Sequence, residues 1–301
     1  MSAAKQHQQR RRSNQRHRGP RHVEPVLDPT WRSAYAPSAE EREANSNVTL
    51  GLQRNLAVGA VVSIILALVL TLGLSVPIFL ALVIPVLYIG GAGVFFQAIR
   101  GRETAGDALA GSLVAHFPVG GSKTDRVRLS TIVERLSATF GLGSINCFVV
   151  EEAVPNATLL RDQDNYTLIV TTGLMHEVEL IELEGVVAHC MARQRLGYIA
   201  IPSLLAAASL SKAARSRYET RIRGWAYRAD EVAAATIRYP LGLQRALERT
   251  ASTVPESGSY FASEGYAKAR WIWFDQHIDG KELAPGDLDQ ASARAQALEE
   301  W

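Results

Sequence analysis

The sequence predicts an α+β protein in which an N-terminal transmembrane helical hairpin precedes a mainly helical domain with a small β-hairpin or sheet. Three observations carry this prediction. No Asp, Glu, Lys or Arg occurs from Leu56 to Ile99. Beyond that run, apolar residues recur at three- and four-residue steps, as on the buried face of a helix. Two short stretches, Asn146–Glu151 and Tyr166–Thr172, are rich in the β-branched and aromatic residues typical of strands.

These observations divide the chain into four parts: a tail over 1–50, a hairpin over 51–100, a domain over 101–280 and a second tail over 281–301. The N-terminal tail has seven Lys or Arg residues from Lys5 to Arg21 and no acid before Glu24. Its few aliphatic residues cannot bury enough surface to offset the entropy of ordering, so we expect disorder to about Asn47. The basic run is interpreted as a solvated tail that helps to fix membrane orientation, with contact to anionic lipid or to nucleic acid as alternatives and no specific nucleic-acid site.

The charge-free run is too long for a single span, because a helix needs roughly 20 apolar residues to cross a bilayer. It fits two helices, Leu56–Leu74 and Pro77–Ile99, joined by a tight turn around Ser75. We expect small residues to let the two helices approach closely, namely Gly90, Gly91 and Gly93.

Lys and Arg residues flank the hairpin on both sides. Arg54 precedes it, Arg100 and Arg102 follow it, and the turn has no charge. This pattern predicts a multi-pass protein of the cell membrane with both termini in the cytoplasm. Two cysteines, Cys147 and Cys190, cannot build a disulfide framework and suit a reducing compartment.

The domain is interpreted as helices around a small sheet. One helical face ends at Gly141, and it comprises Leu129, Ile132, Val133, Leu136 and Phe140. Further helices are expected at Val178–Leu196, Ala214–Tyr239 and Leu241–Arg249. The apolar segment Tyr198–Leu210 is too short to span a bilayer, so it is either buried or dips into the interface. A loosely attached acidic helix is expected after Gly280.

Ile181 to Arg193 reads IELEGVVAHCMAR. With Pro155–Ala157, Ile169–Leu174 and Ala229–Asp230, it resembles the HtpX-like and CAAX-prenyl-protease-type membrane zinc metallopeptidases. The resemblance covers about residues 50–275. It implies a gluzincin-type, metallopeptidase-like domain of the kind found in the bacterial inner membrane.

The family's chemistry requires H-E-x-x-H on a helix, where two His bind zinc and the Glu activates the zinc-bound water. A third ligand, a Glu, lies four residues before the Asp of a second motif. Carried over by position, His189 matches the first His and Asp230 matches the Asp. Cys190 replaces the general base, Arg193 replaces the second His, and Ala226 replaces the third ligand.

These departures imply a degenerate member with no catalytic residue and no bound zinc, since a guanidinium has no lone pair to give a metal. A site rebuilt with His116, His176 or His277, and Cys190 acting as a nucleophile, are the less favoured alternatives. We expect Asp230 to bind His189. We also predict that Arg193 pairs with Asp230 or Glu231 in place of the zinc cross-link, against the alternative of a solvated Arg193.

The resulting functional hypothesis is a membrane-anchored pseudopeptidase that binds or regulates a membrane or peptide partner, with an extended peptide adding as a strand in the old groove. The alternative is an active zinc metalloendopeptidase of membrane protein quality control with a non-standard ligand set. A lipid-bound scaffold is a third reading. Two further clusters each have two interpretations. A basic cluster either faces lipid or is solvated, and it comprises Lys212, Arg215, Arg217, Arg221 and Arg223. An aromatic cluster either packs in the core or binds a partner, and it comprises Trp271, Trp273 and Phe274.

Overall fold

The computed structural model describes residues 37–48, 50–163, 165–276 and 289–300, so the basic run of the N-terminal tail lies outside the described residues. The end of that tail is a helix, α3 (Ala39–Ser46), where disorder is expected from composition. Ser38 caps it by accepting from the Glu41 amide at 3.0 Å, and Asn45 binds the Leu196 carbonyl at 3.1 Å. Local capping and long-range hydrogen bonds, including those from Arg221 to the carbonyls of Ala44 and Asn47, therefore order a segment that has few apolar residues.

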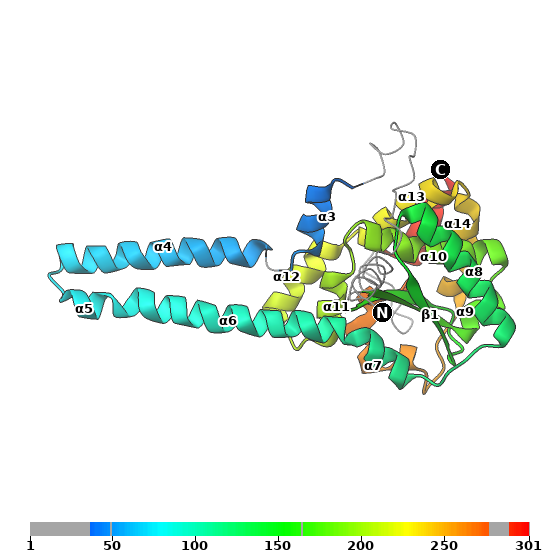
Figure 1. Cartoon of the computed structure of the whole chain (residues 1–301), viewed down its shortest axis with the longest axis horizontal. Coiled ribbons are helices and arrows are strands. Elements are labelled where there is room, and N and C mark those ends of the chain that lie inside the picture. Colours follow the sequence, from blue (N-terminus) through cyan, green and yellow to red (C-terminus); the bar gives the residue numbers. More distant parts are fainter. Residues whose placement is uncertain (1–36, 49, 164, 277–288, 301) are drawn as a thin grey trace, which may run out of the picture.

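Three helices, α4 (Leu50–Gly73), α5 (Ile78–Ala81) and α6 (Val83–Asp107), form an arm that projects from the body of the molecule (Figure 1). The turn around Ser75 is confirmed, and Ser75 has φ 53°. Within α4, Leu56–Gly73 has a mean hydropathy of 2.7 and is long and apolar enough to cross a bilayer. The apolar stretch that follows, Ile78–Val94, is shorter, and a second span over Pro77–Ile99 stays a prediction.

The close approach of α4 and α6 does not involve the expected glycines. A Cβ placed on Gly90, Gly91 or Gly93 would meet nothing within 4 Å. The contact lies instead at Gly59, where a Cβ would stand 2.0 Å from the Tyr88 hydroxyl. That hydroxyl donates to the Leu56 carbonyl at 3.3 Å. The expectation was wrong because it counted small residues in one helix without the register between the two.

The sheet has three strands, β1 (Ile145–Val150), β2 (Ala157–Asp162) and β3 (Asn165–Thr171), in the order β1-β3-β2. β1 runs parallel to β3, and β2 forms an antiparallel hairpin with β3. The two strands read from the sequence are confirmed as β1 and β3. The sequence analysis missed β2, whose first four residues are all buried and show no polar alternation.

Helices pack around this sheet and bury a shared core. Those bounding the central site are α8 (Lys123–Phe140), α9 (Thr172–Glu177), α10 (Leu180–Arg195), α13 (Trp225–Ile237), α14 (Pro240–Ser252) and α16 (Ala291–Glu299). Shorter or peripheral helices are α7 (Leu109–His116), α11 (Ala200–Ala207), α12 (Lys212–Ile222), α15 (Glu264–Ala269) and the 3-10 turns Tyr260–Ala262 and Arg270–Ile272. α8 ends as expected, with Gly141 in the left-handed region at φ 67°.

Three segments of the domain are assigned only approximately from the sequence, and the structure defines them. The single helix over Ala214–Tyr239 is broken into α12 and α13 at Gly224, which has φ 78°. The helix after Gly280 is not loosely attached, because its Ala291, Ala295 and Leu298 belong to the main core. The interior of Tyr198–Leu210 is buried as α11.

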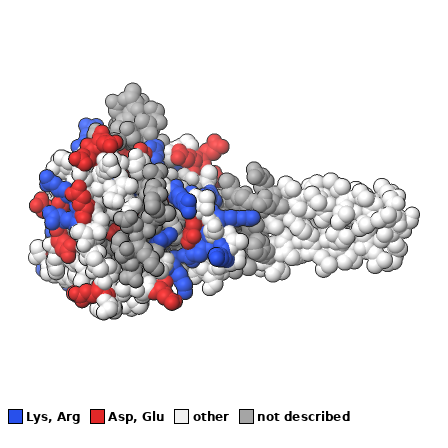
Figure 2. Space-filling model, turned by 180° about the vertical axis from the view of Figure 1, so that it is seen from behind, with Lys and Arg blue, Asp and Glu red and all other residues white. Residues whose placement is uncertain are grey.

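The two open clusters also have defined positions. The aromatic residues Trp271, Trp273 and Phe274 are at most 4% exposed, which confirms the core reading. In the basic cluster, Arg215 donates to the carbonyls of Leu205 and Lys268, and Arg221 donates to that of Asn47. Lys212, Arg217 and Arg223 are exposed. Figure 2 shows the arm as an uncharged rod and Lys and Arg side chains on the body near its base.

Candidate functional site

The site begins where α10 contacts α13. His189, on α10, lies with its Nδ1 atom 2.6 Å from Oδ1 of Asp230, on α13. Both side chains are buried, with His189 0% and Asp230 2% exposed. The expected contact between these two residues is therefore confirmed.

A third residue completes the cluster, and the sequence analysis did not single it out. Arg294, on α16, places Nε 2.5 Å from Oδ2 of Asp230 and a terminal nitrogen 3.0 Å from Oδ1. It is 1% exposed and also donates to the Phe274 carbonyl at 2.7 Å. The available signal was the spacing of Ala291, Arg294, Ala295 and Leu298, which puts a lone Arg on the apolar face of its helix.

Arg193 is buried, but it does not take the partner that was predicted. Its guanidinium donates to the carbonyl of Trp271 at 2.8 Å and to that of Ile272. Among the described residues, Glu231 pairs with Arg228 at 2.7 Å instead. The prediction of a pair with Asp230 or Glu231 was wrong because main-chain carbonyls accept the hydrogen bonds of the Arg193 guanidinium. Every residue has a carbonyl, so the sequence does not indicate such partners. The alternative of a solvated Arg193 is also wrong, since the residue is 5% exposed.

Three of the carbonyls that bind the two arginines belong to one segment, Trp271–Asp275, which lies along the outer edge of β2. The Phe274 amide donates to the Ala157 carbonyl at 2.8 Å, and Trp273 forms an antiparallel bridge with Thr158. Asn156 donates to the Asp275 carbonyl at 2.9 Å. The edge of the sheet next to the site is therefore paired with the chain itself at these positions.

Burial determines the charge states. It lowers the pKa of His189 to about 4, despite the opposing effect of Asp230. Burial alone would raise the pKa of Asp230, but Arg294 and His189 together lower it. Burial lowers the pKa of Arg193 to about 10 and raises that of the Cys190 thiol to about 12. At neutral pH the site thus combines a neutral imidazole, a carboxylate, two guanidinium cations and an un-ionised thiol.

The side chains present do not fit a zinc ion. In the part of the chain that the structure describes, no group of three or more His, Cys, Asp or Glu side chains is placed to hold a metal. Ala226 has no ligand atom in its side chain, and its amide donates to Asp289 at 3.0 Å. The Nε2 atom of His189 is buried, and no described residue binds it. A single imidazole nitrogen among two guanidinium groups is a poor metal site, because zinc sites use three or four protein ligands.

The two other described histidines, His116 and His176, lie apart from this cluster. His116 packs against Phe117 and Tyr260, with ring centroids 5.2 and 5.5 Å apart. His176 is exposed and stands 4.0 Å from Asp125. His277 lies outside the described residues. The described geometry thus gives His189 no second imidazole.

Comparison with known proteins gives partial matches. The chain is 39% identical over 71 residues to a protein named "Protease HtpX homolog" from Tropheryma whipplei, a match that covers 23% of this chain and 24% of that protein. A protein of the same name from Thermoanaerobacter pseudethanolicus is 37% identical over 62 residues, which is 20% of this chain and 21% of that protein.

The chain is similar to part of the HtpX protease homologues. The matched region spans about a quarter of the length of these curated relatives. No protein-family model matches the chain. No solved structure matches it. The comparisons therefore give a metallopeptidase-like relationship over a limited region.

Proposed function

We propose that this chain is a membrane-anchored, metallopeptidase-like protein whose former catalytic centre is a structural cross-link and whose role is non-catalytic binding or regulation. The observation that carries the proposal is the Arg193–Arg294 arrangement. These side chains hold Trp271–Asp275 over His189, at the place where the resemblance would put a metal and its substrate. Water cannot be activated by a carboxylate there, because Cys190 takes the position of the general base.

Membrane anchorage rests on the arm. Large apolar side chains are exposed along α4 from Val58 to Leu72 and along α6 from Val83 to Val94, and Leu56–Gly73 is only 11% buried within the structure. An apolar surface of that extent needs a non-aqueous environment or a partner. We propose that α4 and α6 both cross the cell membrane. The chain would then be a multi-pass, degenerate HtpX-like protein. The Lys and Arg residues that flank the charge-free run support a proposed topology with both termini in the cytoplasm.

The proposed partner is a membrane protein or an extended peptide. A peptide that adds to the outer edge of β2 must first displace Trp271–Asp275, which is attached to Asn156, Arg193 and Arg294. The groove is thus closed in this conformation. A peptide can therefore bind there only when Trp271–Asp275 moves away from β2. This coupling between binding and opening would let the protein act as a regulator.

Zinc stoichiometry tests the proposal. Elemental mass spectrometry on the purified full chain should find zinc well below one equivalent, and chelator treatment should leave thermal stability unchanged. The matched control is His189→Ala, which removes the imidazole nitrogen that the resemblance assigns to zinc. About one zinc per chain that disappears in His189→Ala would contradict the proposal. It would favour an active zinc metalloendopeptidase of membrane protein quality control, to be checked by chelator-sensitive proteolysis.

A further inference from the structure

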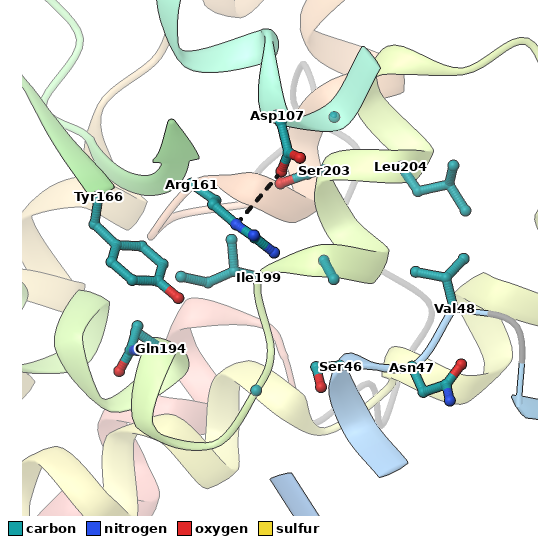
Figure 3. A pocket seen from close by; sticks show the side chains of 13 residues that line it. Ser46, Asn47, Val48, Asp107, Arg161, Tyr166, Gln194, Ile199, Ser203 and Leu204 are labelled. Carbon is teal, nitrogen blue, oxygen red and sulfur yellow. Dashed lines mark ion pairs between the residues drawn. The ribbon is translucent and has the colours of Figure 1, made fainter. Parts of the chain in front are cut away.

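A cavity of about 560 Å³ lies at the foot of the arm, away from His189. It is lined by the chain that enters α4, the end of α6, strands β2 and β3, the end of α10 and the start of α11 (Figure 3). The arm helices and the body therefore meet around it. The resemblance to the metallopeptidases gives this cavity no role. Its lining does not include His189, Asp230 or Arg294.

One wall of the cavity is polar and carries one charge of each sign. Arg161 Nε lies 3.7 Å from Oδ1 of Asp107 and donates to the Gln163 carbonyl at 2.9 Å. The rest of the guanidinium group and the Tyr166 hydroxyl point into the cavity (Figure 3). Both members of the ion pair are accessible, with side-chain exposures of 55% and 36%. A ligand can therefore reach a cation and an anion that lie side by side.

Two residues of the lining each have a buried side-chain oxygen with no hydrogen-bond partner among the described residues. These oxygens are Oγ of Ser203 and Oε1 of Gln194. Ser203 is only 4% exposed. A buried polar atom without a partner destabilises a fold, and such atoms in native proteins are usually satisfied by water or a ligand. Gln194 Oε1 can only accept a hydrogen bond, so its missing partner is a donor.

Apolar side chains also line the cavity, next to the polar residues Ser46 and Asn47. Val48 and Leu204 lie across the cavity from Asp107 and Arg161 (Figure 3). They are 6% and 2% exposed, so little of them is open to solvent outside the cavity. The cavity is thus amphipathic, with charged and hydrogen-bonding groups facing aliphatic side chains.

The position of the cavity relates it to the proposed membrane. The charge-free run ends at Ile99, and α6 continues helically for seven residues to Gly106 in the cavity wall. At 1.5 Å per residue this places the wall about 10 Å beyond the apolar run. α4 begins at Leu50, about 9 Å before Leu56, by the same geometry. The head-group layers extend roughly 5–8 Å beyond the hydrocarbon core on each side, so the cavity wall lies just beyond their cytoplasmic edge.

We propose that this cavity binds the phosphoethanolamine head group of a membrane phospholipid, an inference that rests on the proposed membrane anchorage. The Arg161 guanidinium binds the phosphate. The primary ammonium donates to the Asp107 carboxylate. Adjacent charges of opposite sign match a zwitterion better than an anionic lipid. A choline head group has no N–H to donate, so it forms no hydrogen bond with the Asp107 carboxylate.

Native mass spectrometry on the delipidated full chain in detergent tests the proposal. The probes are phosphatidylethanolamine, phosphatidylcholine and phosphatidylglycerol with identical acyl chains, supplied at equal concentration. We expect the ethanolamine lipid to be retained at least fivefold over each of the others. Arg161→Gln and Asp107→Asn should each abolish that preference. Arg217→Gln, which removes an exposed cation from α12, should preserve it.

Equal retention of the three lipids, a preference for the glycerol lipid, or a preference unchanged in Arg161→Gln would overturn the assignment. Flotation with phospholipid vesicles separates this inference from the anchorage on which it rests. A chain that floats with vesicles but shows no head-group preference refutes the cavity assignment alone. A chain that fails to float, yet binds soluble glycerophosphoethanolamine through Arg161, refutes the anchorage and keeps the head-group site.

Discussion

Replacing Arg294 by Met should lower the free energy of unfolding by about 3–5 kcal/mol, the range found when one partner of a buried ion pair is removed. Both side chains of the pair are shielded from water, with Arg294 0% and Asp230 3% exposed, so no discount for solvent screening is needed. Met keeps most of the apolar volume of the arginine stem. The loss therefore arises from the carboxylate and the Phe274 carbonyl that the guanidinium leaves behind.

Urea titration of the detergent-solubilised chain, followed by tryptophan fluorescence, measures this change through the transition midpoint and slope. Arg228→Met is the matched control, because Arg228 pairs with Glu231 on the same helix as Asp230 but with side-chain exposures of 34% and 29%. That exposed pair should contribute no more than about 1 kcal/mol. Adding Asp230→Asn to Arg294→Met should recover part of the loss, because it removes the uncompensated charge.

The reasoning fails if Arg294→Met and Arg228→Met destabilise the chain equally. It also fails if the double variant is as unstable as the sum of its single changes, since residues that share one buried charge pair cannot be additive. Either result would mean that Arg294 does not neutralise Asp230 inside the folded domain. The cross-link on which the proposed non-catalytic role depends would then be absent.

Further predictions concern protonation, thiol reactivity and helix packing. Because the folded-state pKa of His189 is about 4 and its ordinary value is 6.5, the unfolded chain alone takes up a proton as pH falls between these values. The free energy of unfolding should therefore drop over that window by up to about 3 kcal/mol, and His189→Phe should remove this part of the pH dependence measured by urea titration. The buried Cys190 thiol should resist alkylation at pH 7.5 until the chain unfolds, as followed by mass spectrometry; rapid modification of the native chain would show that the site opens. Gly59→Leu should separate the arm helices at Tyr88 and lower the melting temperature, whereas Gly90→Leu should be nearly neutral because nothing lies within 4 Å of it. Equal effects of the two substitutions would contradict the observed register.

The elements that the sequence predicted well are those whose signal is local and periodic. The charge-free run marks the arm, β-branched residues mark β1 and β3, and Gly141 marks the end of α8. β2 escaped because a strand buried on both faces has no alternation to detect. The break at Gly224 was not predicted because the apolar periodicity continues across it. One glycine with positive φ is enough to turn the chain.

Only part of the site could likewise be predicted from the sequence. The contact between His189 and Asp230 was accessible through the resemblance, which relates two helices 41 positions apart. The role of Arg294 was not accessible, because its partner lies 64 positions earlier in the chain. Arg193 was misassigned for a different reason. Its acceptors are main-chain carbonyls, and any residue type would offer them at those positions.

The insertion of α16 into the core affects the order in which the chain can fold during synthesis. Arg294 follows its partner Asp230 by 64 positions, which corresponds to about 3–13 s of elongation at typical ribosomal rates. During that interval α10 and α13 can associate, but the carboxylate between them lacks its cation. The nascent domain is therefore exposed to chaperones and proteases until α16 leaves the ribosome.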